Sequence, residues 1–212
     1  MIRMLRADQQ VWSPLSVAEV IDALRPVPRR WWLSGGWAIE EYLARGNNTG
    51  RADGRGASRA HGDIDASVAR QDWPAVLAAV HPRFEVWVAR DGALHPVEQA
   101  GPADHNFWLR RRSVTHWQLQ INLEDIDDAG WRYRRDPRIG RPTAQAAWWS
   151  GRAWCIAPAV QLLWKARAPR DVDEHDLRVT IGRLPQSERV WLGAAVRTAH
   201  PESPWATRPE LR

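Results

Sequence analysis

Residues 30–45 join a short aromatic run to a helix-forming run through a serine and two adjacent glycines. Residues 31–33 predict a buried strand and residues 37–45 predict a helix, so Ser34, Gly35 and Gly36 lie in a strand-to-helix turn. Glycine permits unusual dihedrals there and lets backbone N–H groups approach an anion, while the helix N-terminus adds partial positive charge. This turn could bind a phosphate, although two glycines are also common in turns that merely connect a strand to a helix.

A pair of carboxylates follows this turn in the sequence. Asp63 and Asp65 flank Ile64 in a segment, Asp63 to Val68, whose composition predicts a strand. Side chains two residues apart share one face of a strand, and two adjacent carboxylates favour a hard divalent cation with oxygen ligands. A bare Asp-x-Asp also fits a solvated edge strand. Together with the upstream turn, the pair favours a Mg²⁺ site that is completed by phosphate oxygens.

Further elements are predicted along the chain. Ser16 and Glu19 have capping-box spacing and predict a helix to about Leu24, and Asp91-Gly92 predicts a hairpin turn. Apolar and polar residues alternate over residues 114–124, which predicts a half-buried strand.

The last third of the sequence predicts helices. Pro158 opens one, Asp171 with Glu174 caps the next, and a third covers residues 186–198 with Val190 among its inward residues. Residues 46–58 predict a glycine-rich surface loop, and residues 200–212 are expected to be loose.

The Ser-Gly-Gly turn, Arg59-x-His61-x-Asp63-Ile64-Asp65 and the later helical segments resemble the small antibiotic nucleotidyltransferases. These are the aminoglycoside- and lincosamide-modifying members of the polymerase-β-like superfamily. The similarity runs from about Val17 to Trp191. It implies an α+β fold, in which a mixed β-sheet nucleotidyltransferase core with flanking helices covers residues 1–142, and a small C-terminal helical subdomain with its tail covers residues 143–212.

The resemblance also implies a reaction. It indicates Mg²⁺-dependent transfer of a nucleoside monophosphate, AMP from ATP, onto a hydroxyl of an antibiotic or a similar small molecule, with resistance or self-protection as the outcome. Asp63 and Asp65 would be the catalytic metal ligands. The expected nucleotide-binding residues are Ser34, Gly35, Gly36, Arg59, His61 and Lys165, of which Lys165 matches a lysine usual in the family and could pair with Asp173 and Asp176.

A third carboxylate is usual in this family, and Gln120 aligns with its position. A glutamine can lend a carbonyl oxygen to a metal but cannot take a proton, so it cannot be a general base. Three interpretations follow: the alignment is displaced, Glu124 on the same strand face substitutes as the catalytic acid, or transfer activity is lost. Glu124 lies four residues further on, roughly 13 Å along a strand.

Composition limits which metal sites, partners and cellular locations are expected. Basic residues exceed acidic ones by five, Lys165 is the only lysine, and Cys155 is the only cysteine, so cysteine-cluster metal sites are excluded. The arginines are dispersed except at residues 110–112, which does not favour nucleic acid as a partner. No apolar run approaches the roughly 20 residues of a membrane span, and no signal peptide is evident, so we expect a cytoplasmic protein without a membrane partner.

Two other functions stay open at this level. Gln120 favours a catalytically impaired, nucleotidyltransferase-like regulatory or binding protein, such as the antitoxin of a toxin–antitoxin pair that acts on a macromolecule. The arginine content would suit an RNA-directed transferase, although no RNA-binding module is recognisable.

Overall fold

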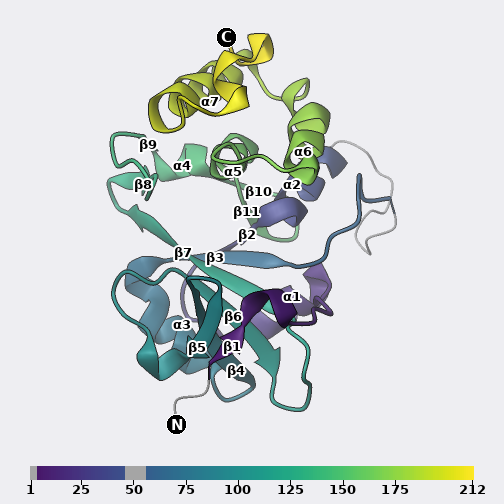
Figure 1. The fold of residues 1–212 in the computed structure, drawn as a ribbon, viewed down its shortest axis with the longest axis vertical. Helices are drawn as coiled ribbons and strands as arrows, with labels where there is room; N and C mark the ends of the chain where they lie inside the picture. Colours follow the sequence, from purple (N-terminus) through teal and green to yellow (C-terminus); the bar gives the residue numbers. More distant parts are fainter. Residues whose placement is uncertain (1–3, 46–55) are drawn as a thin grey trace. The chain divides into compact units, whose positions relative to one another are not determined.

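The computed structural model describes residues 4–45 and 56–212, so most of the loop expected at residues 46–58 lies outside the described residues. The chain forms two compact units, neither of which is continuous in sequence (Figure 1). The described residues of the first unit are 4–33 and 56–124. The second begins at Ser34 with the following helix and resumes at Asp125. This division does not fall at residue 142.

The first unit is built on a mixed sheet with the strand order β1-β5-β4-β6-β7-β3-β2. β3 and β7 are parallel, whereas β7 pairs antiparallel with β6, β6 with β4, β4 with β5, and β5 with β1. The strands are β1 (Leu5–Arg6), β2 (Trp31–Ser34), β3 (Asp65–Ala69), β4 (Phe84–Arg90), β5 (Ala93–Pro96), β6 (Asn106–Arg111) and β7 (Leu119–Asp127). The α-helices among the described residues of this unit are α1 (Val17–Leu24) and α3 (Trp73–Val80).

Local signals fix several of these elements. Ser16 Oγ accepts the Glu19 N–H and the Glu19 carboxylate accepts the Ser16 N–H, which is the expected capping box of α1. Asp91 and Gly92 both have positive φ, 50° and 74°, as a two-residue hairpin turn between β4 and β5 requires. The predicted starts of α1 and of the β4–β5 hairpin are thereby confirmed.

Two strand boundaries differ from expectation. β3 begins at Asp65, after a bend at Gly62, so Asp63 precedes the strand. β7 begins at Leu119 rather than near Val114, because the backbone of Trp117 bonds instead to Val11 and Ser13 at 2.9 Å each. The alternation along β7 is confirmed: Leu119, Ile121 and Leu123 are buried on one face, and Ile121 is completely covered.

The second unit is mainly helical. α2 (Gly35–Ala44) packs on α5 (Pro158–Lys165) and α6 (Asp171–Ile181), and α5 packs on α7 (Gln186–Ala199). Tyr42 at the end of α2 donates to the Arg183 carbonyl at 2.8 Å. The smaller elements are β8 (Gly130–Arg132), β9 (Gly140–Arg141), α4 (Thr143–Ala146), β10 (Ala147–Trp149) and β11 (Trp154–Ile156), with β8 pairing with β9 and β10 with β11.

The C-terminal segment corrects the expectation that it is loose. Residues 204–207 and 209–211 form two 3-10 helices that pack on α7, and Trp205 and Leu211 are fully buried. Trp205 Nε1 also donates to Glu174 at 2.7 Å. Only a few apolar side chains hold this segment in place, so its polar and proline-rich composition gives no sign that it is ordered.

Two details of the helices also differ. Val190 is 44 % exposed, because α7 turns that side chain away from the face that buries Leu192 and Val196. Asp173, not Glu174, caps α6, since its carboxylate accepts the Arg170 N–H at 3.0 Å.

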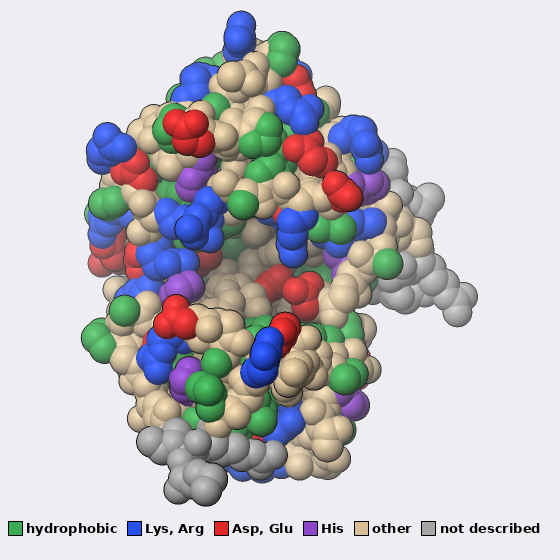
Figure 2. All heavy atoms as spheres, viewed as in Figure 1, with side chains coloured by type: hydrophobic (Ala, Val, Ile, Leu, Met, Phe, Trp, Pro, Cys, Tyr) green, Lys and Arg blue, Asp and Glu red, His purple; other side chains and the backbone are tan. Residues whose placement is uncertain are grey.

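Charged side chains are mixed on the surface. Figure 2 shows Lys and Arg side chains interspersed with Asp and Glu on the drawn face of each unit. Arg110 of the arginine run is bonded to Glu85 at 2.7 Å and lies over the Trp117 ring, and Arg112 donates to the His81 carbonyl. In the described part of the chain, no helix is long and apolar enough to cross a membrane.

We predict that Gly193→Ala destabilises the protein by about 1–3 kcal/mol, as overpacking does. A Cβ at Gly193 in α7 would lie 1.8 Å from the Leu211 carbonyl oxygen, so the C-terminal 3-10 helix would have to move. Gly182→Ala is the matched control, because its Cβ would meet nothing within 4 Å. Denaturant unfolding compares them, and equal stabilities of the two variants would contradict the packing described here.

Candidate functional site

Asp65 stands at the head of the parallel strand pair. The register places Asp65 opposite Gln120, Ser67 opposite Asn122 and Ala69 opposite Glu124. The Gln120 N–H donates to the Ile64 carbonyl at 2.9 Å, which continues the pairing one residue before β3. Asp65 is partly buried and Asp63 is exposed. Gln120 is therefore the residue that the neighbouring strand presents to Asp65.

Amide side chains surround the Asp65 carboxylate. Gln120 Nε2 donates to Asp65 Oδ1 at 2.5 Å, and Asn122 Nδ2 donates to the same oxygen at 3.1 Å. Asn122 Oδ1 in turn accepts from Gln120 Nε2 at 3.2 Å and from Asn106 Nδ2 of β6 at 2.9 Å. Asn122 lies within the alternating segment 114–124 but had no role assigned from the sequence, and Asn106 was not identified from the sequence at all.

Glu124 lies further along the same strand. It is 5 % exposed and accepts a hydrogen bond from the Ser67 hydroxyl at 3.2 Å. Its register partner is Ala69, four residues after Asp65. Because a strand rises about 3.3 Å per residue, this position is roughly 13 Å along the ladder from the Asp65–Gln120 pair.

The donor set can be tested against a metal ion. Within residues 4–45 and 56–212, no group of three or more His, Cys, Asp or Glu side chains is arranged to hold a metal. Mg²⁺, however, is commonly bound by only one or two carboxylates together with waters and substrate phosphates. A Mg²⁺ ion at Asp63 and Asp65 would therefore depend on phosphate and water oxygens for the rest of its coordination.

The glycine turn belongs to the second unit. Gly35 has φ 65°, a conformation that favours glycine, and its N–H donates to Gln161 Oε1 of α5 at 2.9 Å. Ser34 is 3 % exposed, and its Oγ has no hydrogen-bond partner among the described residues. Gly36 follows in the first turn of α2. The Gly35 N–H is thus already bonded to Gln161, a residue that was not identified from the sequence.

Arg59 and His61 precede the acidic pair in irregular backbone. The Arg59 guanidinium donates to the carbonyl of its neighbour Ala60 at 3.0 Å. His61 is partly buried.

Lys165 lies at the end of α5 in a buried ion-pair cluster. Its Nζ is 2.8 Å from Asp173 Oδ1 and 3.0 Å from Asp176 Oδ2, so the pairing considered from sequence is present. Burial alone would raise the pKa of Asp173, but hydrogen bonds from Arg170 and Lys165 outweigh it and lower this pKa to about 2. Arg170 also pairs with Asp173 at 2.9 Å, so two cations balance the two carboxylates, and Lys165 joins α5 to α6.

Comparison with protein-family models finds no match, and comparison with curated proteins finds none either. Several chains of solved structures are similar, including two structures of one protein. The solution structure of the antibiotic-resistance factor ANT(2'')-Ia matches with a TM-score of 0.57 and 17% identity over 88% of this chain and 91% of that chain. The crystal structure of ANT(2")-Ia in complex with adenylyl-2"-tobramycin matches with a TM-score of 0.50 and 15% identity over 86% of this chain and 95% of that chain. The chain therefore has the mixed α+β fold of a nucleotidyltransferase.

Proposed function

We propose that this protein is a Mg²⁺-dependent nucleotidyltransferase that moves AMP from ATP to a hydroxyl group of an antibiotic or similar small molecule. The observation that carries the proposal is the position of Asp65 at the head of the β3–β7 pair in a chain with this fold. ANT(2")-Ia, which shares the fold, is known in complex with an adenylylated aminoglycoside. That complex supports a small-molecule acceptor.

The glycine turn and the start of α2 would bind the triphosphate. Backbone N–H groups and the helix N-terminus favour an anion there, and Ser34 would add a hydroxyl. A phosphate must compete with Gln161 for the Gly35 N–H. Because a hydrogen bond to an anion is roughly twice as strong as one between neutral groups, a phosphate can displace that side chain.

Asp63 and Asp65 would hold the Mg²⁺ together with phosphate oxygens. When bound, the metal neutralises charge on the transferred phosphoryl group. Gln120 and Asn122 keep the Asp65 carboxylate in place through the two amide hydrogen bonds to Oδ1.

Transfer also requires a group that removes the proton of the acceptor hydroxyl, and no carboxylate lies opposite Asp65 on β7 to do so. Gln120 occupies the place beside Asp65 and cannot accept a proton. Glu124 can, but it lies four residues along β7 in a hydrogen bond with Ser67. We therefore expect slow transfer with nucleotide binding retained.

The amides around Asp65 also favour a second candidate, a nucleotide-binding regulatory protein without transfer activity, such as an antitoxin. The two candidates share the nucleotide site and differ in whether pyrophosphate is released.

We predict that Asp65→Asn weakens ATP binding in the presence of Mg²⁺ by about tenfold or more, the scale of losing part of a metal site. The variant should stay folded, since the asparagine carbonyl can still accept from Gln120 and Asn122. Asp8→Asn, which alters an exposed ion pair with Arg6, is the control. Calorimetric titration with and without a chelator measures the effect, and unchanged affinity in both Asp63→Asn and Asp65→Asn would refute the metal role.

We predict that Gln120→Asp raises the rate of pyrophosphate release from ATP, with hydroxylated antibiotics as acceptors, by roughly 10²–10⁴-fold. That is the range for a positioned proton acceptor. Glu124→Gln separates the alternatives: little change leaves position 120 as the determinant, and a crippling loss makes Glu124 the base. Fast release by the wild type that neither substitution alters would contradict this account of the third acid.

A further inference from the structure

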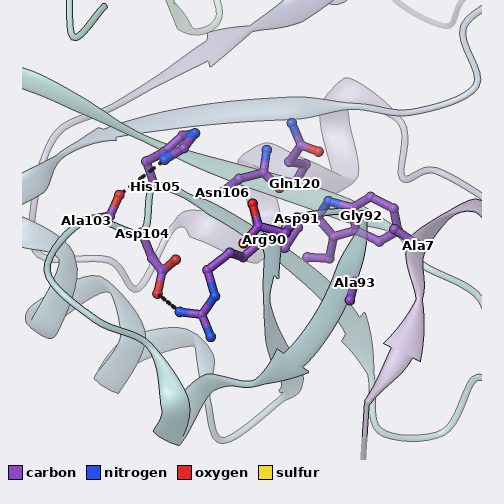
Figure 3. A pocket seen from close by; sticks show the side chains of 12 residues that line it. Ala7, Arg90, Asp91, Gly92, Ala93, Ala103, Asp104, His105, Asn106 and Gln120 are labelled. Atoms are coloured by element: carbon purple, nitrogen blue, oxygen red, sulfur yellow. Dashed lines mark hydrogen bonds and ion pairs between the residues drawn. The ribbon is translucent and has the colours of Figure 1, made fainter.

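Two arginines of the second unit differ from others in how their charge is balanced. In the pocket of the first unit that Figure 3 shows, Arg90 reaches the Asp104 carboxylate at 3.0 Å, so the two charges cancel. Arg135 and Arg167 have no such carboxylate partner within residues 4–45 and 56–212. Both side chains are exposed, so an anion in solution can reach them.

The contacts of Arg135 hold its guanidinium group without cancelling its charge. Nη1 donates to the Trp164 carbonyl at 3.1 Å and to the Tyr133 hydroxyl at 3.3 Å, and both acceptors are neutral. The guanidinium carbon also lies 5.1 Å from the centroid of the Trp164 ring. An arginine has five N–H donors, so these contacts leave donors for a ligand.

Tyr133 connects this arginine to His200 at the end of α7. The Tyr133 hydroxyl oxygen is 2.8 Å from His200 Nε2 and 3.5 Å from the Leu163 carbonyl. Because Arg135 donates to the hydroxyl oxygen, the hydroxyl proton points to the nearer acceptor, Nε2. An imidazole nitrogen that accepts a hydrogen bond belongs to a neutral ring. Burial and the charges of Arg135 and Arg167 lower the pKa of His200, which favours the same neutral form.

The charges around His200 do not balance. Asp136 raises the pKa of His200, but its carboxylate is already paired with Arg138 at 2.6 Å. α5 and α7 both end beside Tyr133, and each helix C-terminus is equivalent to about half a negative charge. Arg135 and Arg167 therefore leave about one positive charge uncompensated, and protonation of His200 would make it about two.

We propose that Arg135, Arg167 and His200 form a binding site for a small dianion of the phosphate class, and that His200 takes up a proton when the anion binds. Guanidinium groups match the oxygens of such anions in charge and in geometry. Once protonated, His200 Nε2 would donate to the Tyr133 hydroxyl oxygen, and the hydroxyl proton would turn to the Leu163 carbonyl.

The arrangement favours a small anion over a nucleic-acid strand. Arg135 and Arg167 both act on the Tyr133 hydroxyl as well as on His200, so the cations surround one point. A strand is bound by a groove of positive charge that follows its backbone. The site also goes beyond the proposed transfer reaction, for which Lys165 was expected to bind the nucleotide, since Lys165 extends instead to the carboxylates of α6.

The test follows the titration of His200 by proton NMR in the full chain. Its imidazole resonance is assigned by its absence from His200→Gln. The titration is carried out with a chelator in sodium sulfate and in sodium chloride of equal ionic strength, because sulfate stays divalent where histidine titrates. Arg167→Gln removes one cation of the site, and Arg178→Gln, which removes an exposed arginine of α6 bonded to His175, is the matched control. Thermal unfolding shows that each variant is folded.

We expect sulfate to raise the pKa of His200 by about one unit relative to chloride, as a nearby opposite charge does. Arg167→Gln should weaken sulfate binding by about tenfold, the scale of a charge-assisted hydrogen bond, and Arg178→Gln should leave it unchanged. The same pKa in sulfate and chloride, or equal losses in the two arginine variants, would overturn the proposal. A decathymidylate that displaces sulfate at a lower phosphate concentration than pyrophosphate does would assign the site to nucleic acid and would also overturn it.

Discussion

The parallel pairing of β3 with β7 is the constraint on which the acidic site depends. It brings together two segments that are more than fifty residues apart, and its register sets Asp65 against Gln120. A slip of one residue would turn the opposite face of either strand toward this position. The buried face of Leu119, Ile121 and Leu123 resists such a slip, so packing of the apolar face holds the polar face in place.

The polar face is then ordered by a single charge. Because the Asp65 carboxylate accepts and cannot donate when ionised, it orients Asn122, and Asn122 orients Asn106. A side chain at position 65 that could only donate would reverse this order. One ionised group therefore orients amide side chains on two neighbouring strands.

Sequence patterns predict those parts of the fold that depend on local chemistry. The capping box of Ser16 and the Asp91-Gly92 turn need only their neighbours, and both are found in the structure. The role of Asn106 depends on β6 lying beside β7, and the occupation of the Gly35 N–H depends on α5 lying beside α2. The order of residues 204–211 depends on two buried side chains, Trp205 and Leu211, in an otherwise polar segment. Such facts of tertiary packing leave no periodic signal.

The burial of Lys165 has a practical consequence for chemical labelling. It is the sole lysine of the sequence, and its side chain is 10% exposed and held between Asp173 and Asp176. Burial and the two ion pairs keep the Lys165 amine from reagents in solution. Amine-directed crosslinkers and acylating dyes will therefore find no reactive side chain on the folded protein, whereas unfolding exposes one. Acylation of Lys165 would thus report how often α6 separates from α5.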